Sequence, residues 1–466
     1  MTANPDPASF RDPSGFVYRD DNGVLFRQIH AVYLENYRRL MDTGLYQDLI
    51  QDQLMVEHAE VPIEKGCTPE AVFVIQPKPV SFISYPYEWC FSQLRDAARL
   101  TLEVQRRALR HGMVLKDCSA YNVVFEGPRP IFIDTLSFEP YVEGKPWAAY
   151  RQFCQHFLAP LALSAHVDTR LTQLLRIHLD GIAVTLAARL LPRKTWLRPG
   201  LALHLHAQAW FQHRDEVRQK KGRAPSGKSR VSRNAHLGLL DSLDAAINAL
   251  SLRDSVSEWS DYYETHSYTE AGVQKKQELV KRFLQAIRPT TVWDLGANTG
   301  CYARLAAEVG AHVTAFEMDP ACVELMYQTF RKESMESVLP LCFDLANPSP
   351  NLGWAQEERR GWIERGPVDL VMALALVHHL GIGNNLPFSK MAACFARLAP
   401  GLIIEFIPKD DPQTQRLLES REDVFFGYSV EHFESAFARW YVVCEKEPIP
   451  GGGRILYRME RISQTE

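Results

Sequence analysis

The sequence predicts an α/β protein whose C-terminal half is a doubly wound, mostly parallel sheet of seven strands, preceded by a mainly helical α+β domain. From about residue 286 onward, seven apolar strand-like segments alternate with helix-like segments, a pattern typical of a parallel sheet with helices on both faces. The last two of these segments are joined only by Pro450-Gly451-Gly452-Gly453, which fits an antiparallel pair. Before residue 214, segments with apolar residues three or four apart predict helices.

Composition and charge limit the class of protein. The chain has 466 residues, which suggests two or three domains, and its net charge of −4 argues against a chain-wide nucleic-acid surface. We find no signal peptide and no run of about 18 apolar residues, so we expect a cytoplasmic location and no membrane partner. Nine scattered cysteines without a C-x-x-C pair predict reduced thiols rather than zinc ligands or disulfides.

Three regions follow along the chain. We place the N-terminal domain at residues 1–213; it opens with a hairpin, because Asn22-Gly23 between two apolar runs is a strong turn signal. Residues 214–234 hold eight Lys or Arg against two acids and predict a basic linker or loop. The third region is 235–466, with lead-in helices over 235–285 and the sheet over 286–466.

The candidate site lies at the carboxyl ends of the strands, where such sheets bind ligands. The first strand runs into Asp294-Leu295-Gly296-Ala297-Asn298-Thr299-Gly300, whose glycines let the backbone approach a ligand. Asn298 stands where a further glycine is common, so we expect it at positive φ, facing the cofactor. Glu317 ends the second strand and suits the hydroxyls of a ribose, and Asp344, after the third, suits an amino group.

This region resembles the class I, Rossmann-like S-adenosylmethionine-dependent methyltransferases, and its loop matches their D/E-x-G-x-x-x-G pattern. The resemblance implies S-adenosylmethionine as cofactor, with Asp294 and the loop on its methionine part, Glu317 on the ribose and Asp344 on the adenine. The cofactor-binding residues we expect are Asp294, Gly296, Ala297, Asn298, Gly300, Glu317, Met318, Asp344, Leu345, Ala373 and Leu374. A nicotinamide-binding half-domain is the alternative, disfavoured because the loop is not G-x-G-x-x-G and the chain ends in the antiparallel hairpin. The layout also resembles bacterial nodulation-type methyltransferases.

Catalysis is expected after the fourth strand, where His378 and His379 stand. One of them is a candidate general base; a purely structural role stays an equal alternative. Glu405 and Lys409 are lower-ranked candidates for the catalytic residue.

The absence of D/N-P-P-Y/F and Pro-Cys motifs disfavours nucleobase methylation, so we expect a small-molecule acceptor, such as a carbohydrate or natural product, rather than nucleic acid. The oligomeric state stays open. Four aromatic residues before the first strand are either a lid or core packing: Trp259, Tyr262, Tyr263 and Tyr268.

The N-terminal domain carries a second pattern: Asp117, then Asn122, two short strands, and Asp134. This segment resembles the catalytic and metal-binding segment of protein kinases and aminoglycoside phosphotransferases. The resemblance implies that Asp117 orients an acceptor hydroxyl while Asn122 and Asp134 hold magnesium. There are departures, however: Leu115 stands where these enzymes have His, Thr135 follows Asp134 in place of Phe, and no glycine-rich phosphate loop or lysine strand precedes them.

We therefore expect a degenerate kinase-like scaffold that shapes or binds substrate, without a metal. The alternatives are an active phosphotransferase or bifunctional protein using Asp117, Asn122 and Asp134, and a binding protein in which both domains are degenerate. Residues 222–229 match the phosphate-loop pattern G-x-x-x-x-G-K-[ST], but the charged residues before them cannot form the buried strand that such a loop needs.

Overall fold

The computed structural model describes residues 5–220, 230–252, 269–419 and 422–462. The chain divides into two compact units: Met1–Ser255 with Leu352–Arg359, and Val256–Asn351 with Arg360–Glu466. The phosphate-loop pattern at 222–229 and the aromatic residues between 259 and 268 lie outside the described residues. Within the described ranges, no helix is long and apolar enough to span a bilayer.

The boundary between the units lies later in the chain than the residue 235 that we expected. Helix α10 (Arg233–Asn248), expected to lead into the sheet, instead contacts α3 and α8 of the first unit. The reason is its apolar stripe, since Leu240, Leu243 and Ile247 are all buried.

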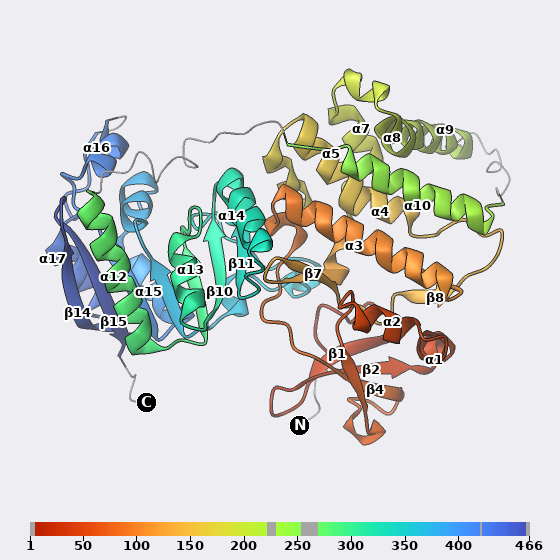
Figure 1. The fold of residues 1–466 in the computed structure, drawn as a ribbon, viewed down its shortest axis with the longest axis horizontal. Coiled ribbons are helices and arrows are strands. Elements are labelled where there is room, and N and C mark those ends of the chain that lie inside the picture. Colours follow the sequence, from red (N-terminus) through yellow and green to blue (C-terminus); the bar gives the residue numbers. More distant parts are fainter. Residues whose placement is uncertain (1–4, 221–229, 253–268, 420–421, 463–466) are drawn as a thin grey trace. The chain divides into compact units, whose positions relative to one another are not determined.

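The first unit begins with a four-stranded antiparallel sheet in the order β1-β2-β4-β3 (Figure 1). Its strands are β1 (Gly15–Arg19), β2 (Leu25–His30), β3 (His58–Val61) and β4 (Ala71–Pro77). The expected hairpin is confirmed, with Gly23 at φ +78° in the β1–β2 turn. Two further antiparallel pairs follow: β5 (Met113–Leu115) with β8 (Phe138–Pro140), and β6 (Val123–Glu126) with β7 (Arg129–Phe132).

Helices make up most of the rest of this unit. The longest, α3 (Phe91–Arg110), is buried along much of its length by Leu94, Ala97, Leu102 and their neighbours. The others are α1 (Leu34–Asp42), α2 (Leu45–Gln51), α4 (Tyr150–Phe153), α5 (Ala159–His166), α6 (Leu174–Ile177), α7 (Val184–Leu190), α8 (Pro199–Leu201) and α9 (Gln208–Lys220). Two π-helical turns, Cys154–Leu158 and Ala202–Ala207, run into α5 and α9.

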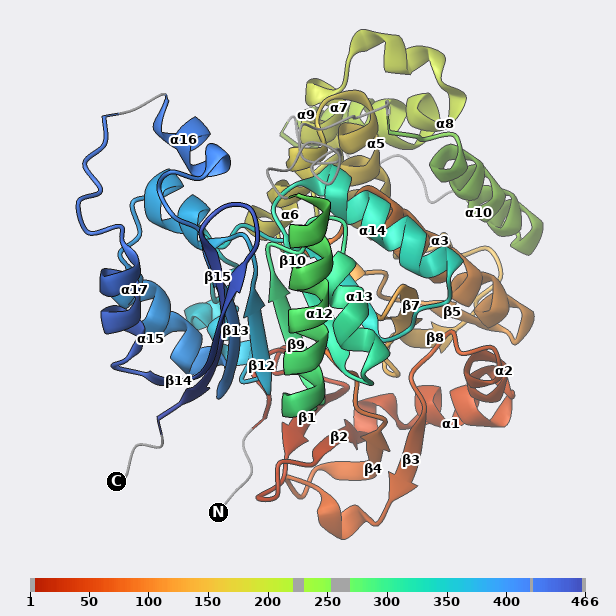
Figure 2. The ribbon, with the colours of Figure 1, turned by 60° about the vertical axis from the view of Figure 1, so that its left-hand side comes forward.

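The second unit is built on one seven-stranded sheet in the order β11-β10-β9-β12-β13-β15-β14 (Figure 2). The first five positions are parallel, and β15 lies antiparallel between β13 and β14. The strands are β9 (Thr291–Leu295), β10 (His312–Glu317), β11 (Val338–Cys342), β12 (Leu370–Ala373), β13 (Gly401–Phe406), β14 (Tyr441–Ile449) and β15 (Arg454–Arg461). The mostly parallel sheet and its terminal hairpin are as predicted.

Helices cover both faces of this sheet, as a doubly wound fold requires. On one face, α12 (Glu270–Ile287), α13 (Cys301–Glu308) and α14 (Pro320–Lys332) share a core with strand residues such as Val292 and Met372. On the other, α15 (Phe388–Leu398) and α17 (Val430–Phe437) pack aromatic side chains against Phe406 and Tyr457. A short α16 (Pro412–Leu418) lies between α15 and α17 in the chain.

The loop after β9 needs an unusual backbone. Gly296, Asn298 and Gly300 all have positive φ, at +76°, +50° and +85°. The prediction that Asn298 adopts positive φ is therefore confirmed. At Gly300 the space is also filled, because a Cβ there would lie 2.7 Å from Phe330 Cζ and 2.8 Å from Met326 Cγ.

We predict that Gly300→Ala destabilises the protein more than Gly310→Ala. Both positions have positive φ, but nothing lies within 4 Å of a Cβ at Gly310. Gly310→Ala should therefore lower the free energy of unfolding by about 1 kcal/mol of backbone strain, and Gly300→Ala by a further ~1–3 kcal/mol of overpacking. Urea unfolding of the two variants measures the difference. Equal losses would show that α14 yields to the added methyl group.

Candidate functional site

The strand ends of the second unit bring the expected cofactor residues to one edge of the sheet. Strands β9, β10, β11 and β12 are parallel neighbours, so their carboxyl ends lie together. The loop Gly296–Gly300 follows β9, Glu317 ends β10, Asp344 follows β11, and Ala373 ends β12. This common edge is the candidate site.

Glu317 holds the loop in its bent conformation. Its Oε2 accepts a hydrogen bond from the Asn298 N–H at 2.8 Å, and its Oε1 accepts from the Asp319 N–H at 2.9 Å. Burial raises the pKa of Glu317, and these backbone donors act in the opposite direction. The positive φ of Asn298 turns its N–H toward this carboxylate, which explains why β10 and the loop after β9 form one structure.

Asp294 lies beneath the loop with an unused acceptor. Its side chain is buried, and Oδ2 has no hydrogen-bond partner within the part of the chain that the structure describes. Burial raises the pKa of Asp294 to about 7; the charge of Lys276 and the Ala303 N–H act against this, and Glu317 adds to it. A buried carboxylate oxygen without a donor is costly, so this position favours a ligand that brings its own N–H or O–H.

A buried ion network lies behind Asp294. Lys276 on α12 donates from Nζ to Glu405 Oε2 at 2.8 Å, and both side chains are at most 3% exposed. Glu405 Oε2 also accepts from the Ala375 N–H at 2.8 Å, while Arg454 forms two hydrogen bonds to Asp411 at 2.7 and 3.0 Å. The network thus connects α12, the end of β13, the turn after β12 and the start of β15.

Sequence reasoning ranked Glu405 low and missed Lys276, Asp411 and Arg454. A signal existed for Lys276: it lies in one helical stripe with the buried Gly272, Leu279, Val280 and Phe283. A single charge on an apolar helix face predicts a buried partner. Arg454 had no comparable signal, because the Asp411 that pairs with it stands 43 residues away in sequence.

His378 and His379 follow β12 as expected, but they differ in exposure. His378 is fully buried, and neither ring nitrogen has a hydrogen-bond partner among the described residues. His379 is half-buried, opens a π-helical turn and packs on His378 with ring centroids 4.1 Å apart. Burial lowers the pKa of His379 to about 4 and holds the pKa of His378 well below its usual value, so both are neutral near pH 7.

The other residues predicted to bind the cofactor differ in how exposed their side chains are. Met318 is exposed, Asp344 and Leu345 are half-buried, and Leu374 is buried. Asp344 Oδ1 accepts from the Ala346 N–H at 2.8 Å, which closes the turn after β11. Lys409 pairs with Asp423 on the surface, with Nζ 2.9 Å from Oδ1, which argues against its lower-ranked catalytic role.

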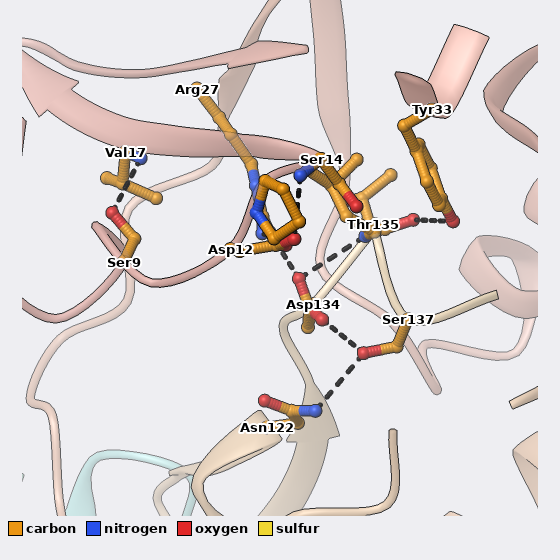
Figure 3. Close-up of polar contacts among 12 residues, drawn as sticks. Ser9, Asp12, Ser14, Val17, Arg27, Tyr33, Asn122, Asp134, Thr135 and Ser137 are labelled. Atoms are coloured by element: carbon orange, nitrogen blue, oxygen red, sulfur yellow. Dashed lines mark hydrogen bonds and ion pairs between the residues drawn. The ribbon is translucent and has the colours of Figure 1, made fainter. Parts of the chain in front are cut away.

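The acidic cluster of the first unit is internally paired (Figure 3). Asp134 Oδ1 lies 2.5 Å from Arg27 Nη1, and its Oδ2 accepts a short hydrogen bond from the Ser137 hydroxyl. The Arg27 charge and these hydrogen bonds hold the pKa of Asp134 down, although burial acts against them. Asn122 donates to Ser137 Oγ at 3.1 Å, and Asp117 accepts from Gln152 at 2.7 Å. Both oxygens of Asp134 therefore already have donors within the protein.

Comparison with known proteins gives one full-length relative. The chain is 35% identical over 461 residues to the nodulation protein NoeA of Rhizobium meliloti (strain 1021), covering 97% of this chain and 95% of that one. No protein-family model matches.

Solved structures match less than half of the chain. A magnesium protoporphyrin IX methyltransferase, ChlM, of Synechocystis PCC 6803 with bound SAH gives a TM-score of 0.32 at 19% identity, over 41% of this chain and 84% of that one. The N-methyltransferase NodS of Bradyrhizobium japonicum WM9 gives 0.32 at 10% identity over 41% and 97%. The bifunctional kinase-methyltransferase WbdD gives 0.31 at 12% identity over 44% and 42%. At such scores the fold rests on the strand order of the chain itself.

We predict that Lys276→Met lowers the free energy of unfolding by about 3 kcal/mol, because it leaves the buried Glu405 carboxylate with only the more distant Arg454, whose Nη1 lies 3.8 Å from Oε1, as counter-charge. The double variant Lys276→Met/Glu405→Gln should recover more than half of this loss, since the amide oxygen still accepts from the Ala375 N–H. Chemical denaturation measures both. If the double variant is as unstable as the single variant, then lost packing, and not the unpaired charge, causes the decrease in the free energy of unfolding.

Proposed function

The chain belongs to the family of the nodulation protein NoeA, and on that premise we propose that its second unit is an S-adenosylmethionine-dependent methyltransferase domain. The observation that carries the proposal is the antiparallel β15 between β13 and β14, combined with the Asp294–Gly300 loop after the first strand. A dinucleotide-binding sheet has six strands in the order 3-2-1-4-5-6 and a G-x-G-x-x-G loop, and neither is present here.

The residues at the strand ends suit this cofactor. Asp294 Oδ2 is an unused buried acceptor beside a loop whose glycines permit close approach, and an ammonium group such as that of the methionine part would satisfy it. Glu317 would take the ribose hydroxyls and Asp344 the adenine amino group. Ala297, Met318, Leu345 and the strand-end pair Ala373 and Leu374 would supply apolar and backbone contacts around these groups.

S-adenosylmethionine, when bound, supplies a methyl group on a sulfonium, which is a good leaving group. The protein's own task is then to position the acceptor in line and to remove its proton. We assign proton removal to His379, since its imidazole is neutral near pH 7 and is less enclosed than that of His378. His378 is completely enclosed and packs beneath it, so its role is to orient the His379 ring.

The acceptor belongs to the small molecules rather than to nucleic acid. The net charge of −4 does not favour a polyanionic partner, and the strand-end segment after β12 lacks the motifs of nucleobase methylation. The relative NoeA is named for nodulation, which is compatible with a carbohydrate or natural-product acceptor. The first unit would bind or shape this substrate.

Phosphotransfer by the first unit is the second candidate, and the Asp117, Asn122 and Asp134 group is the observation behind it. A magnesium ion does not fit this group as it stands, because the Arg27 guanidinium lies 2.5 Å from Asp134 Oδ1 and would repel a second cation there. The Arg27 guanidinium supplies the positive charge that a metal would bring. We therefore propose a kinase-like scaffold without phosphotransfer activity.

We predict that the full chain binds S-adenosylhomocysteine in calorimetry and that Asp294→Asn weakens binding about tenfold to hundredfold, through loss of a charged hydrogen bond. Asp369→Asn is the matched control, because Asp369 accepts from Thr290 and Thr291 at the opposite edge of the same sheet. Absence of binding by the wild type, or equal weakening in both variants, would overturn the proposal.

The affinity should also depend on pH. Because the pKa of Asp294 is raised to about 7, the carboxyl is protonated below that pH and must lose its proton to accept from an ammonium group. Binding should tighten as pH rises from 5.5 to 7 by up to about tenfold per unit and level off above. Glu317 and Lys276 also face Asp294, so the Asp294→Asn titration, expected to be flat, isolates its contribution. A flat wild-type profile contradicts the assignment.

For the first unit, we predict that ATP with magnesium gives no saturable heat with the full chain, since Arg27 already neutralises Asp134. Calorimetry at millimolar nucleotide checks this, with Asp168→Asn as the control for an acidic side chain outside the cluster, where Asp168 pairs with Arg170. Saturable binding that Asp134→Asn abolishes and Asp168→Asn leaves unchanged would restore the phosphotransferase hypothesis.

A further inference from the structure

The first unit carries an exposed apolar surface beside cationic side chains, which we call the aromatic–cationic patch. It lies on α7, the 3-10 turn Arg193–Leu197 and the continuous helix formed by α8, Ala202–Ala207 and α9, which Figures 1 and 2 both show gathered together. Its exposed apolar side chains are Leu190, Trp196, Leu197, Leu203, Trp210 and Phe211. Each is at least 43% exposed, and Leu197 is 86% exposed.

Ring contacts connect the turn and the helix that carry these side chains. Leu203 and His206 stand in the π-helical turn Ala202–Ala207 and Trp210 in α9, so all three belong to one continuous helix, and Trp210 packs on Phe211 with ring centroids 5.0 Å apart. Trp196 stacks on His206 with ring centroids 4.5 Å apart and 14° between the planes. The neighbouring Thr195 hydroxyl meets His206 Nε2 at 2.8 Å, which fixes the turn against the helix. Trp196 therefore packs on this helix over the buried His206 while staying 53% exposed itself.

The charged residues of the segment that carries the patch have a single sign. Residues 181–214 contain no Asp or Glu, and they contain five cations: Arg189, Arg193, Lys194, Arg198 and Arg214. Arg193, Lys194 and Arg198 stand in or next to the same turn as Trp196 and Leu197 and are exposed. The Arg214 guanidinium lies over Trp210 at 5.2 Å and over Phe211 at 5.9 Å. The cations thus border the apolar side chains directly, in a chain whose net charge is negative.

We propose that the aromatic–cationic patch docks on the surface of an anionic lipid bilayer. Tryptophan at the edge of an apolar surface suits the headgroup region, leucine and phenylalanine side chains enter the acyl boundary, and arginine and lysine pair with anionic headgroups. Such surface contact needs no membrane-spanning helix. The sequence expectation of no membrane partner rested on the lack of a spanning segment, so it does not address this mode.

The side chains of the aromatic–cationic patch favour a bilayer over single-stranded nucleic acid and over a protein partner. Single-stranded nucleic acid would stack on aromatic rings, but three of the six apolar side chains are leucines, which offer no stacking face. A protein partner would bury the patch within an interface, where lysine is depleted and charges are paired across the contact. A bilayer uses both the leucines and the cations, and the inference is independent of the methyltransferase proposal.

Co-sedimentation of the full chain with vesicles tests the inference. We expect binding to vesicles of phosphatidylcholine with about one third phosphatidylglycerol, and at least tenfold weaker binding to phosphatidylcholine alone, because each cation near an anionic surface contributes about fivefold. Leu197→Ser/Phe211→Ser and, separately, Arg193→Glu/Lys194→Glu should each reduce binding to the anionic vesicles at least tenfold.

The controls remove equal numbers of side chains elsewhere on the first unit. Ile63→Ser/Val142→Ser replaces two exposed apolar residues, and Lys78→Glu/Arg110→Glu reverses two exposed cations. Both controls should bind as the wild type does, and circular dichroism should show all variants folded. No vesicle binding by the wild type overturns the proposal. Equal loss in test and control variants overturns it as well, as does a patch-dependent dimer in sedimentation velocity that forms in place of lipid binding.

Discussion

The buried pair between Lys276 and Glu405 is the interaction on which the candidate site depends. Taking both charges out of water is costly, and their attraction offsets that cost only with close geometry and further hydrogen bonds. Here Glu405 also accepts from the Ala375 N–H, which holds the segment leading to His378 and His379. The Glu405 carboxylate thus connects α12, the helix before the sheet, to the segment after β12 that is proposed for catalysis. The same contacts therefore stabilise the fold and position the candidate site.

Two carboxylates in this chain, the buried Asp294 and the half-buried Asp134, differ in how they are paired. Asp134 resembles a metal ligand in sequence, yet an arginine and a hydroxyl take both of its oxygens. Asp294 has one oxygen without any donor in the described chain, and burial raises its pKa to about 7. A carboxylate that an arginine already neutralises gains little from a further cation, whereas a buried oxygen without a donor gains free energy when a ligand supplies one. This contrast supports the proposal of a ligand site in the second unit and of a scaffolding role for the first.

Because the acidic cluster of the first unit is proposed to be structural, the exposed surface of that unit is the better candidate for a function. Its α3 core is well buried, while the α7–α9 region exposes tryptophan, leucine and phenylalanine next to cations. Exposed apolar side chains gathered in this way cost solubility, so they are retained where they meet a partner. A unit that attaches to a lipid surface would hold the proposed methyltransferase domain near acceptors that are themselves associated with that surface.

The sequence by itself determined the alternation of strands and helices, the terminal hairpin, the glycine-rich loop with the positive φ of Asn298, and the acids at the strand ends. These are local signals, because periodicity and backbone preference act over a few residues. Only the tertiary structure decided which charges meet. Arg27 and Asp134 are separated by 107 positions, Lys276 and Glu405 by 129, and Asp411 and Arg454 by 43. No local pattern selects such partners; they are fixed by how strands and helices pack, and that packing also assigned α10 to the first unit.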